Sequence, residues 1–201
     1  MTTWVEPRGG RRRGPLGLLQ AWVQVLRHPV QFFHEAVSPG DQGPGLAFAI
    51  VVVLIEETTR LLLVPAARPA IGGDTIVGSA IFIALAALLV TPLSLHAFAA
   101  LETLVLTPAP SRGGVSETVQ ILAYAAAPCV VAGVPVPEVR IAAGLWAAGL
   151  LVVGFHVVHE LRYSAAAVFS APAAILGIGY GFRWFGAVVD LFPVVGQTIP
   201  W

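Results

Sequence analysis

Residues 76–106 read IVGSAIFIALAALLVTPLSLHAFAALETLVL, an apolar run in which Glu102 is the only charged side chain. A helix needs about 20 mostly apolar residues to cross the roughly 30 Å of hydrocarbon in a bilayer. The run is longer than that and contains Pro92, so we expect its helix to tilt or to extend beyond the lipid. The stretch predicts a helix that spans a membrane.

Four further apolar blocks have bilayer-spanning length. They lie at residues 46–64, 116–134, 139–161 and 164–187, separated by short loops rich in Pro and Gly. Hydrophobic residues make up 57% of the 201 residues and charged residues 11%, compared with about 25% charged in soluble domains. The sequence therefore predicts an all-α fold, a polytopic membrane helical bundle with five transmembrane helices in residues 46–190. Five spans with short loops leave no room for a soluble catalytic domain.

The two ends of the chain predict peripheral segments. Residues 1–15 are expected to be a disordered basic tail, residues 16–45 an amphipathic interfacial segment broken near Pro29 and followed by a turn, and residues 191–201 an interfacial tail. Four arginines of the basic tail are expected to contact anionic lipid headgroups, namely Arg8, Arg11, Arg12 and Arg13.

The arginine distribution predicts the orientation. With the N-terminus in the cytoplasm, the inner set is Arg8, Arg11, Arg12, Arg13, Arg27, Arg112 and Arg162, and the outer set is Arg68, Arg140 and Arg183. Because positive residues favour the cytoplasmic side, we expect a multi-pass protein of the cell membrane with its N-terminus inside and its C-terminus outside.

Glu56, Glu57 and Arg60 form one polar cluster at membrane depth. Arg60 is four residues from Glu56 and three from Glu57, so one carboxylate can be neutralised on the same helix face. The second needs another partner, because an unpaired charge in the bilayer is costly. The cluster is either a structural ion pair or a site for proton, ion or hydrolytic chemistry.

A second polar cluster is expected near the cytoplasmic ends of the second and fourth spans. It comprises His96, Glu102, His156, His159 and Glu160. Structural hydrogen bonding, contact with a proton or substrate, and metal binding are the three interpretations. The HxxHE spacing matches no zinc signature, so we predict no metal and no cofactor.

Ala173, Gly177 and Gly181 recur every four residues in the fifth span. Such a stripe of small residues lets another helix approach closely, either within the chain or in a homo-oligomer.

Two short motifs resemble those of a known family. Asp41-Gln42-Gly43-Pro44 before the first span and Ala123-Tyr124-Ala125-Ala126-Ala127-Pro128 in the third are similar to the D-L-x-G-P and G-Y-x-x-x-P elements of the Yip (Ypt/Rab-interacting) membrane proteins. The Pro-x-x-Phe-Phe element at 29–33, followed by five spans, resembles that family's prokaryotic branch.

The resemblance implies a non-enzymatic membrane scaffold or adaptor with an unidentified protein partner, and no nucleic acid is expected as a partner. In this interpretation Pro44 fixes the entry of the first span, Asp41 caps it, and Tyr124 brings a polar group that must be satisfied.

Two alternatives come from other functional classes. Glu56 to Arg60 resembles the EExxxR motif of CAAX-type intramembrane proteases with one residue fewer, and Phe155 to His159 fits their FxxxH element. Those enzymes also need a histidine after FxxxH, and no histidine follows His159. A small transporter or channel is the other alternative, although the chain carries no internal repeat to support it.

Overall fold

The computed structural model describes residues 14–105 and 113–192, and every regular element in this part of the chain is helical. The α-helices are α1 (Pro15–Arg27), α2 (Pro29–Ala36), α3 (Gly43–Leu63), α4 (Thr75–Leu85), α5 (Thr91–Val105), α6 (Val115–Ala125), α7 (Pro137–Val158), α8 (Tyr163–Ala173) and α9 (Trp184–Leu191). Two 3-10 helices are η1 (Pro65–Ala67) and η3 (Ala127–Val131), and two π-helical segments are η2 (Ala86–Val90) and η4 (Ala174–Gly181). The predicted all-α class is confirmed.

The stretch at 76–106 forms one helical run, Thr75–Val105, from α4 through η2 to α5. It begins where the Asp74 carboxylate accepts hydrogen bonds from the amides of Ile76 (2.8 Å) and Val77 (3.0 Å). The π-helical turn η2 lies just before Pro92, whose missing amide hydrogen interrupts the α-helical ladder. The long run therefore bends without breaking.

Three helical runs among the described residues are long and apolar enough to cross a membrane: Thr75–Val105, Pro137–Val158 and Tyr163–Gly181. Val115–Val131 is apolar but shorter. Helix α3 has 21 residues but carries Glu56, Glu57 and Arg60, so its composition is less typical of a span. The five predicted segments are all helical, and their number as true spans stays a prediction.

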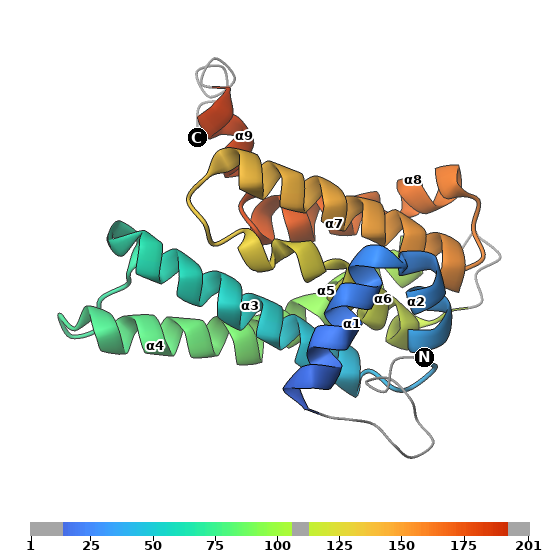
Figure 1. The fold of residues 1–201 in the computed structure, drawn as a ribbon, viewed down its shortest axis with the longest axis horizontal. Helices are drawn as coiled ribbons and strands as arrows, with labels where there is room; N and C mark the ends of the chain where they lie inside the picture. Colours follow the sequence, from blue (N-terminus) through green and yellow to red (C-terminus); the bar gives the residue numbers. More distant parts are fainter. Residues whose placement is uncertain (1–13, 106–112, 193–201) are drawn as a thin grey trace.

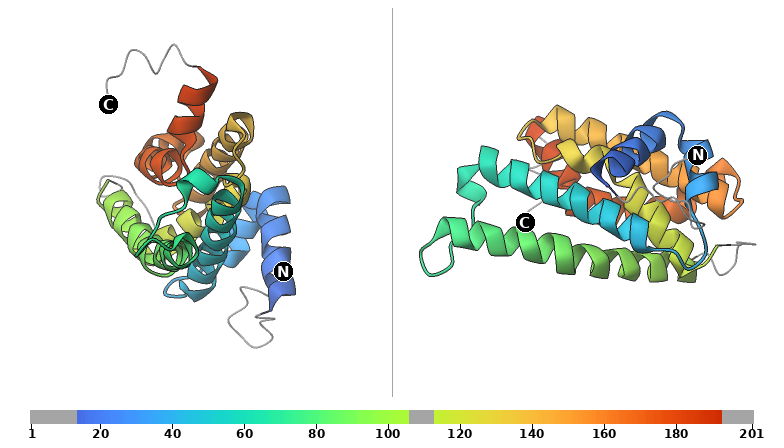
Figure 2. Two further views of the ribbon diagram at one scale, coloured as in Figure 1. Left: turned by 90° about the vertical axis from the view of Figure 1, so that its left-hand side faces the viewer. Right: turned by 60° about the horizontal axis from the view of Figure 1, so that its bottom comes forward.

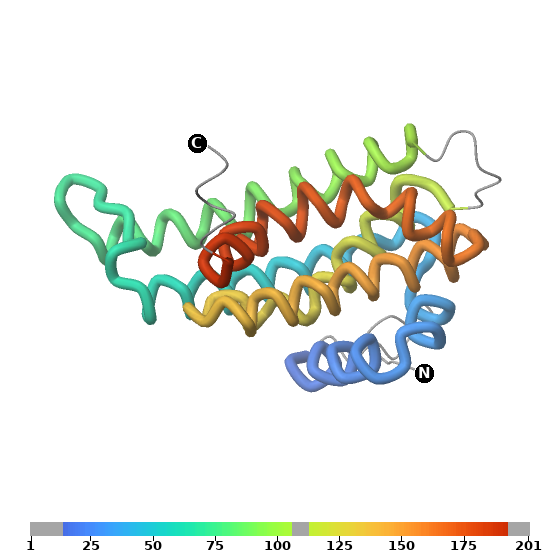
Figure 3. Tube along the Cα trace, turned by 90° about the horizontal axis from the view of Figure 1, so that it is seen from above, coloured from blue at the N-terminus to red at the C-terminus, as the bar shows by residue number. Residues whose placement is uncertain are grey.

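Helices α3 and α4 form a long hairpin that extends beyond the start of α7 (Figure 1). The α4–α5 run passes along the whole bundle, antiparallel to α3, as the right-hand view of Figure 2 shows. Seen from above, α1 and α2 lie on one flank and α4–α5 on the opposite flank (Figure 3). Large apolar side chains of α4, η2 and α5 are exposed, including Ile76, Leu88 and Leu93. Such a surface suits lipid as its solvent.

The N-terminal helices pack differently from the prediction. The break at Pro29 is present, with α1 ending at Arg27 and α2 beginning at Pro29. Part of their apolar surface is buried in the protein core, with Val25, Phe32 and Phe33 all 3% exposed or less, while Leu16, Leu19, Val23 and Val30 are exposed. From the sequence, these helices were expected to lie on lipid. An amphipathic sequence does not distinguish a protein groove from a bilayer surface, because both bury the apolar face of a helix.

The fifth predicted span, 164–187, ends earlier than expected. Its helical run stops at Gly181, and Arg183 adopts a left-handed backbone conformation (φ 57°) that starts a new direction for α9. Hydropathy did not reveal this turn, because Trp184 to Val189 remain apolar. A positive φ at a residue other than glycine is uncommon and costs free energy, so the contacts of Arg183 must hold it there.

Candidate functional site

Tyr124 of α6 lies at the centre of an aromatic cluster that joins four helices. Its ring packs edge-on against Phe32 of α2, with centroids 4.9 Å apart, and against Phe48 of α3 at 5.2 Å. Phe48 also contacts Trp22 of α1 at 4.8 Å. Aromatic pairs in such geometry add about 0.5–1.5 kcal/mol each beyond their buried area. The motif tyrosine therefore fastens the N-terminal helices to the membrane bundle.

Pro128 explains how α1 is anchored beside this cluster. Because proline has no amide hydrogen, α6 cannot continue through it, and the chain changes to the 3-10 helix η3 after Ala126. In this turn the Ala127 carbonyl accepts a hydrogen bond from the Trp22 indole at 3.0 Å. The proline of the second motif thus creates an acceptor for the N-terminal segment.

The first motif begins α3, although its cap differs from the prediction. The N-cap residue is Gln42 rather than Asp41, and no side chain provides the cap hydrogen bond. Gly43 and Pro44 occupy the first turn, where a proline costs no hydrogen bond. The Gln42 side chain instead reaches α5, with its Oε1 2.8 Å from Nε2 of His96. The motif therefore connects the start of α3 to α5.

Gln120 fixes the turn that precedes this motif. Its side-chain oxygen accepts from the amide of Ser38 at 3.1 Å, and its side-chain nitrogen donates to the Ser38 carbonyl at 2.7 Å. The side chain is fully buried. Sequence reasoning missed Gln120, and the one available signal was a polar residue among the apolar residues of the third span.

The first polar cluster is an ion-pair network that joins α3 to the start of α9. Glu57 accepts from Nε of Arg60 at 2.7 Å and from Nη2 of Arg183 at 2.6 Å. Of the two carboxylates within reach of Arg60, it is thus Glu57 that pairs with it, and Glu56 lies 3.2 Å from Nη1 of Arg183. The additional cation that the two carboxylates need is Arg183. From the sequence alone, Arg183 is expected only as one of the outer arginines.

Glu56 is the most deeply placed member of this network. Its residue is 1% exposed, and its Oε1 has no hydrogen-bond partner, although Arg183 lies at ion-pair distance. A Cβ added at Gly133 would come within 3.0 Å of the amide of Arg60 and still closer to the carbonyl of Glu56. Only glycine permits this close approach, so the backbone at Gly133 covers that side of the cluster.

The second predicted cluster lies at the opposite end of the bundle, and its members have separate partners. Glu102 accepts from the amide of Ala173 at 2.7 Å, His159 lies 3.3 Å from the Thr118 hydroxyl, and His156 stacks on Tyr163 at 3.9 Å. The ring of His156 also hydrogen-bonds the Leu161 carbonyl. Glu160 is exposed and adopts a positive φ of 52°.

These side chains do not converge on one centre. No three His, Cys, Asp or Glu residues gather to hold a metal ion within residues 14–105 and 113–192. His96 is engaged by Gln42, away from the histidines of α7.

The small-residue stripe of the fifth span faces α5. Ala173 is buried beside Glu102, and a Cβ at Gly177 would meet the Phe98 ring at 3.5 Å. A Cβ at Gly181 would meet no atom within 4 Å. The stripe thus packs within the chain at one end and borders open space at the other. The predicted headgroup contacts Arg8, Arg11, Arg12 and Arg13 lie outside the described residues.

A family model described as the Yip1 domain matches residues 23–183. The chain belongs to the Yip1 domain family. The match runs from α1 to Arg183 and so includes both motifs, the ion-pair network and the aromatic cluster apart from Trp22. Neither the curated proteins nor the solved structures contain a match to the chain. The family consists of membrane proteins and is not known for enzymatic activity, and the apolar helices identify this Yip1-domain chain as a multi-pass membrane protein.

The geometry separates the two motifs on which the protease alternative depended. Trp184, next to Arg183, donates its indole hydrogen to the Ile141 carbonyl near the start of α7 at 3.1 Å. His159 follows Ile141 by 18 residues and lies just past the other end of α7, about 27 Å further along the helix axis. A metal held by His159 could not act together with Glu56 or Glu57 over that distance.

Proposed function

We propose that this Yip1-domain protein is a scaffold or adaptor of the cell membrane, without catalytic activity. Its N-terminus lies in the cytoplasm and its C-terminus outside. The N-terminal helices α1 and α2 carry the surface that binds a protein partner. The arginine asymmetry of the sequence supports this orientation.

The rigid attachment of α1 and α2 is the observation that carries the proposal. Phe32 packs on Tyr124, Trp22 donates to the Ala127 carbonyl, and Ser38 exchanges two hydrogen bonds with Gln120. An adaptor needs a docking surface that is fixed relative to the membrane, because a preorganised surface loses less entropy when a partner binds. A lipid anchor alone would not require these specific bonds.

The outward face of α2 is the part of this surface that we assign to the partner. Gln31, His34 and Glu35 are exposed there, and the Gln31 amide donates to Glu35 at 2.9 Å. The buried side of the same helix is occupied by Phe32, Phe33 and Ala36. The helix is thus apolar toward the bundle and polar toward the aqueous phase.

Site-specific photo-crosslinking in living cells tests the proposal. A photoreactive amino acid is placed at Gln31 or at His34, and the matched control is placed at Leu88, which is also exposed but lies on the apolar α4–η2 surface. We expect one discrete protein adduct from the two α2 positions and none from Leu88. The same adducts at all three positions, or none at α2, would contradict the adaptor function.

A further inference from the structure

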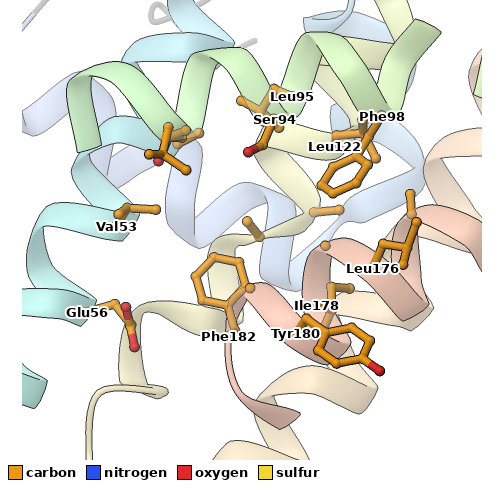
Figure 4. A pocket seen from close by; sticks show the side chains of 18 of the residues that line it. Val53, Glu56, Ser94, Leu95, Phe98, Leu122, Leu176, Ile178, Tyr180 and Phe182 are labelled. Carbon is orange, nitrogen blue, oxygen red and sulfur yellow. The ribbon is translucent and has the colours of Figure 1, made fainter. Parts of the chain in front are cut away.

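A cavity of about 450 Å³ lies within the helical bundle. Its walls come from α3, from η2 and α5, from α6, and from α8 with η4. Most wall residues are apolar, and Figure 4 shows Val53, Leu95, Phe98, Leu122, Leu176 and Ile178 around the space. The volume falls in the range of about 300–1,000 Å³ that is typical of small-molecule sites.

The cavity has one charged end. Glu56 points from α3 into the space between the helices, at the end of the cavity opposite Leu176 in Figure 4. Its Oε1 is buried and accepts no hydrogen bond. The guanidinium groups of Arg60 and Arg183 approach the carboxylates from outside the cavity lining. The cavity end therefore presents a carboxylate oxygen that accepts no hydrogen bond, within a cluster in which two carboxylates and two guanidinium groups balance in charge.

Two π-helical segments line this cavity from different helices. Ala86 and Val90 of η2 form part of one wall, and Leu176 to Gly181 of η4 form part of another. Each segment lies next to a proline, Pro92 or Pro172. π-Helical turns are rare and occur often at functional sites, because they widen a helix locally.

Small residues of η4 form part of the cavity wall. Gly177 and Gly181 both line it, and a Cβ at Gly181 would have no neighbour within 4 Å. An alkyl chain in a space of this size would make dispersion contacts with the apolar wall residues. Together these observations describe an apolar slot with a polar end.

We propose that the cavity binds a membrane amphiphile, whose alkyl chain lies among the apolar walls and whose primary ammonium group donates hydrogen bonds to Glu56. An ammonium group has three donors and no acceptor, so it can donate the hydrogen bond that Oε1 does not accept from Arg183, whose Nη1 lies 3.2 Å away at ion-pair distance. The alkyl chain makes dispersion contacts with the apolar walls. This binding site goes beyond the adaptor function and does not rest on it.

Photolabelling of purified protein in nanodiscs tests this site. The probes are three long-chain molecules with the same photoreactive group in the chain: a primary amine, an alcohol and a carboxylate. We expect the amine to label cavity residues of α5 and η4 at least fivefold more than the carboxylate does. Equal or stronger labelling by the carboxylate would overturn the ammonium assignment.

Two glycine-to-leucine variants test whether the probe labels the protein from within the cavity or from elsewhere on the surface. Gly181→Leu fills the open end of the cavity, and Gly149→Leu adds the same side chain on α7, where a Cβ also has no neighbour within 4 Å but where the residue does not line the cavity. Labelling by the amine should fall at least fivefold in Gly181→Leu and stay within twofold in Gly149→Leu. Equal labelling of both variants would refute the site.

A third variant tests the role of the Glu56 charge. Glu56→Gln keeps an acceptor oxygen but removes the ionic partner, so labelling by the amine should fall about tenfold while labelling by the alcohol stays within twofold. Helical circular dichroism and gel filtration check that each variant is folded. An unchanged amine signal in folded Glu56→Gln would refute the contact.

The source of the ligand is distinguished by the lipid of the nanodisc. The amine probe is compared in discs that contain phosphatidylethanolamine and in discs of phosphatidylcholine, whose quaternary headgroup has no N–H donor. Weaker labelling in the ethanolamine discs identifies a bilayer lipid as the occupant. Equal labelling in both discs assigns the site to a single-chain amine instead.

Discussion

Replacing Arg183 by methionine should be the most destabilising single change in the ion-pair network. Methionine keeps an apolar stem but removes the guanidinium that lies 3.2 Å from Glu56 and 2.6 Å from Glu57. Glu56 would then lose its ion-pair partner, and Glu57 would keep only Arg60. The carboxylate of Glu56 is almost completely buried, so water cannot replace the lost cation.

The magnitude follows from the burial of the partners. Removing one member of a buried ion pair costs about 3–5 kcal/mol, because the other charge stays buried without compensation. We expect about 3 kcal/mol here, at the lower end of this range, because 28% of the Arg183 side chain is exposed and already partly screened. Arg60→Met should cost about half as much, because Glu57 retains Arg183 and Glu56 is unaffected.

Reversible unfolding in mixed detergent micelles measures these free energies. Arg162→Met is the matched control, since Arg162 is exposed and its replacement should change the free energy of unfolding by no more than about 0.5 kcal/mol. Adding Glu56→Gln to Arg183→Met should restore at least about 1 kcal/mol, because the uncompensated charge is removed. An Arg60→Met variant that is less stable than Arg183→Met would refute this account of the network.

Three further predictions address the packing and the orientation of the chain. In a chain with Cys129→Ala, a cysteine at Ala66 should react with a membrane-impermeant reagent added outside the cell and a cysteine at Gln31 should not, and the reverse pattern would invert the orientation. Gln120→Leu leaves the amide and carbonyl of Ser38 without their partner, so the free energy of unfolding should fall by about 1–3 kcal/mol, whereas an unchanged value would mean that water replaces Gln120. Replacing Arg8, Arg11, Arg12 and Arg13 by glutamine should expose the N-terminal segment to limited proteolysis in anionic vesicles while the unfolding of the bundle stays unchanged, and unaltered protection would argue against headgroup binding.

Apart from the end of the fifth span, the helix boundaries of the predicted spans could be placed from the sequence to within about three residues. The second span was expected at 76–106 and forms Thr75–Val105, and the fourth was expected at 139–161 and forms Pro137–Val158. These boundaries are local properties, set by apolar length and by Pro, Gly and polar residues at the ends. The same local reasoning placed the break between α1 and α2 at Pro29.

The contacts between distant segments could not be predicted in this way. Spacing alone indicates that Arg60 can reach Glu57, but nothing in the periodicity of α3 indicates that Arg183, 126 residues from Glu57, completes the network. Trp22 lies in the segment predicted to be interfacial, and its indole donates to the carbonyl of Ala127, 105 residues away. An isolated sequence shows that a buried polar group needs a partner, but not which partner it has.

The prolines inside the spans lie next to backbone groups that bond to distant segments of the chain. Pro128 ends α6, and the neighbouring Ala127 carbonyl accepts the hydrogen bond from Trp22 that anchors α1. Pro172 lies inside α8, and the neighbouring Ala173 amide donates to Glu102 of α5. A proline removes one amide hydrogen and disturbs the ladder around it, so the adjacent backbone groups become available to other helices. In a membrane bundle, where polar groups have no water to bind, such positions are the places to expect long-range hydrogen bonds. A polar or indole side chain elsewhere in the chain is then a candidate partner, as Trp22 and Glu102 are in this protein.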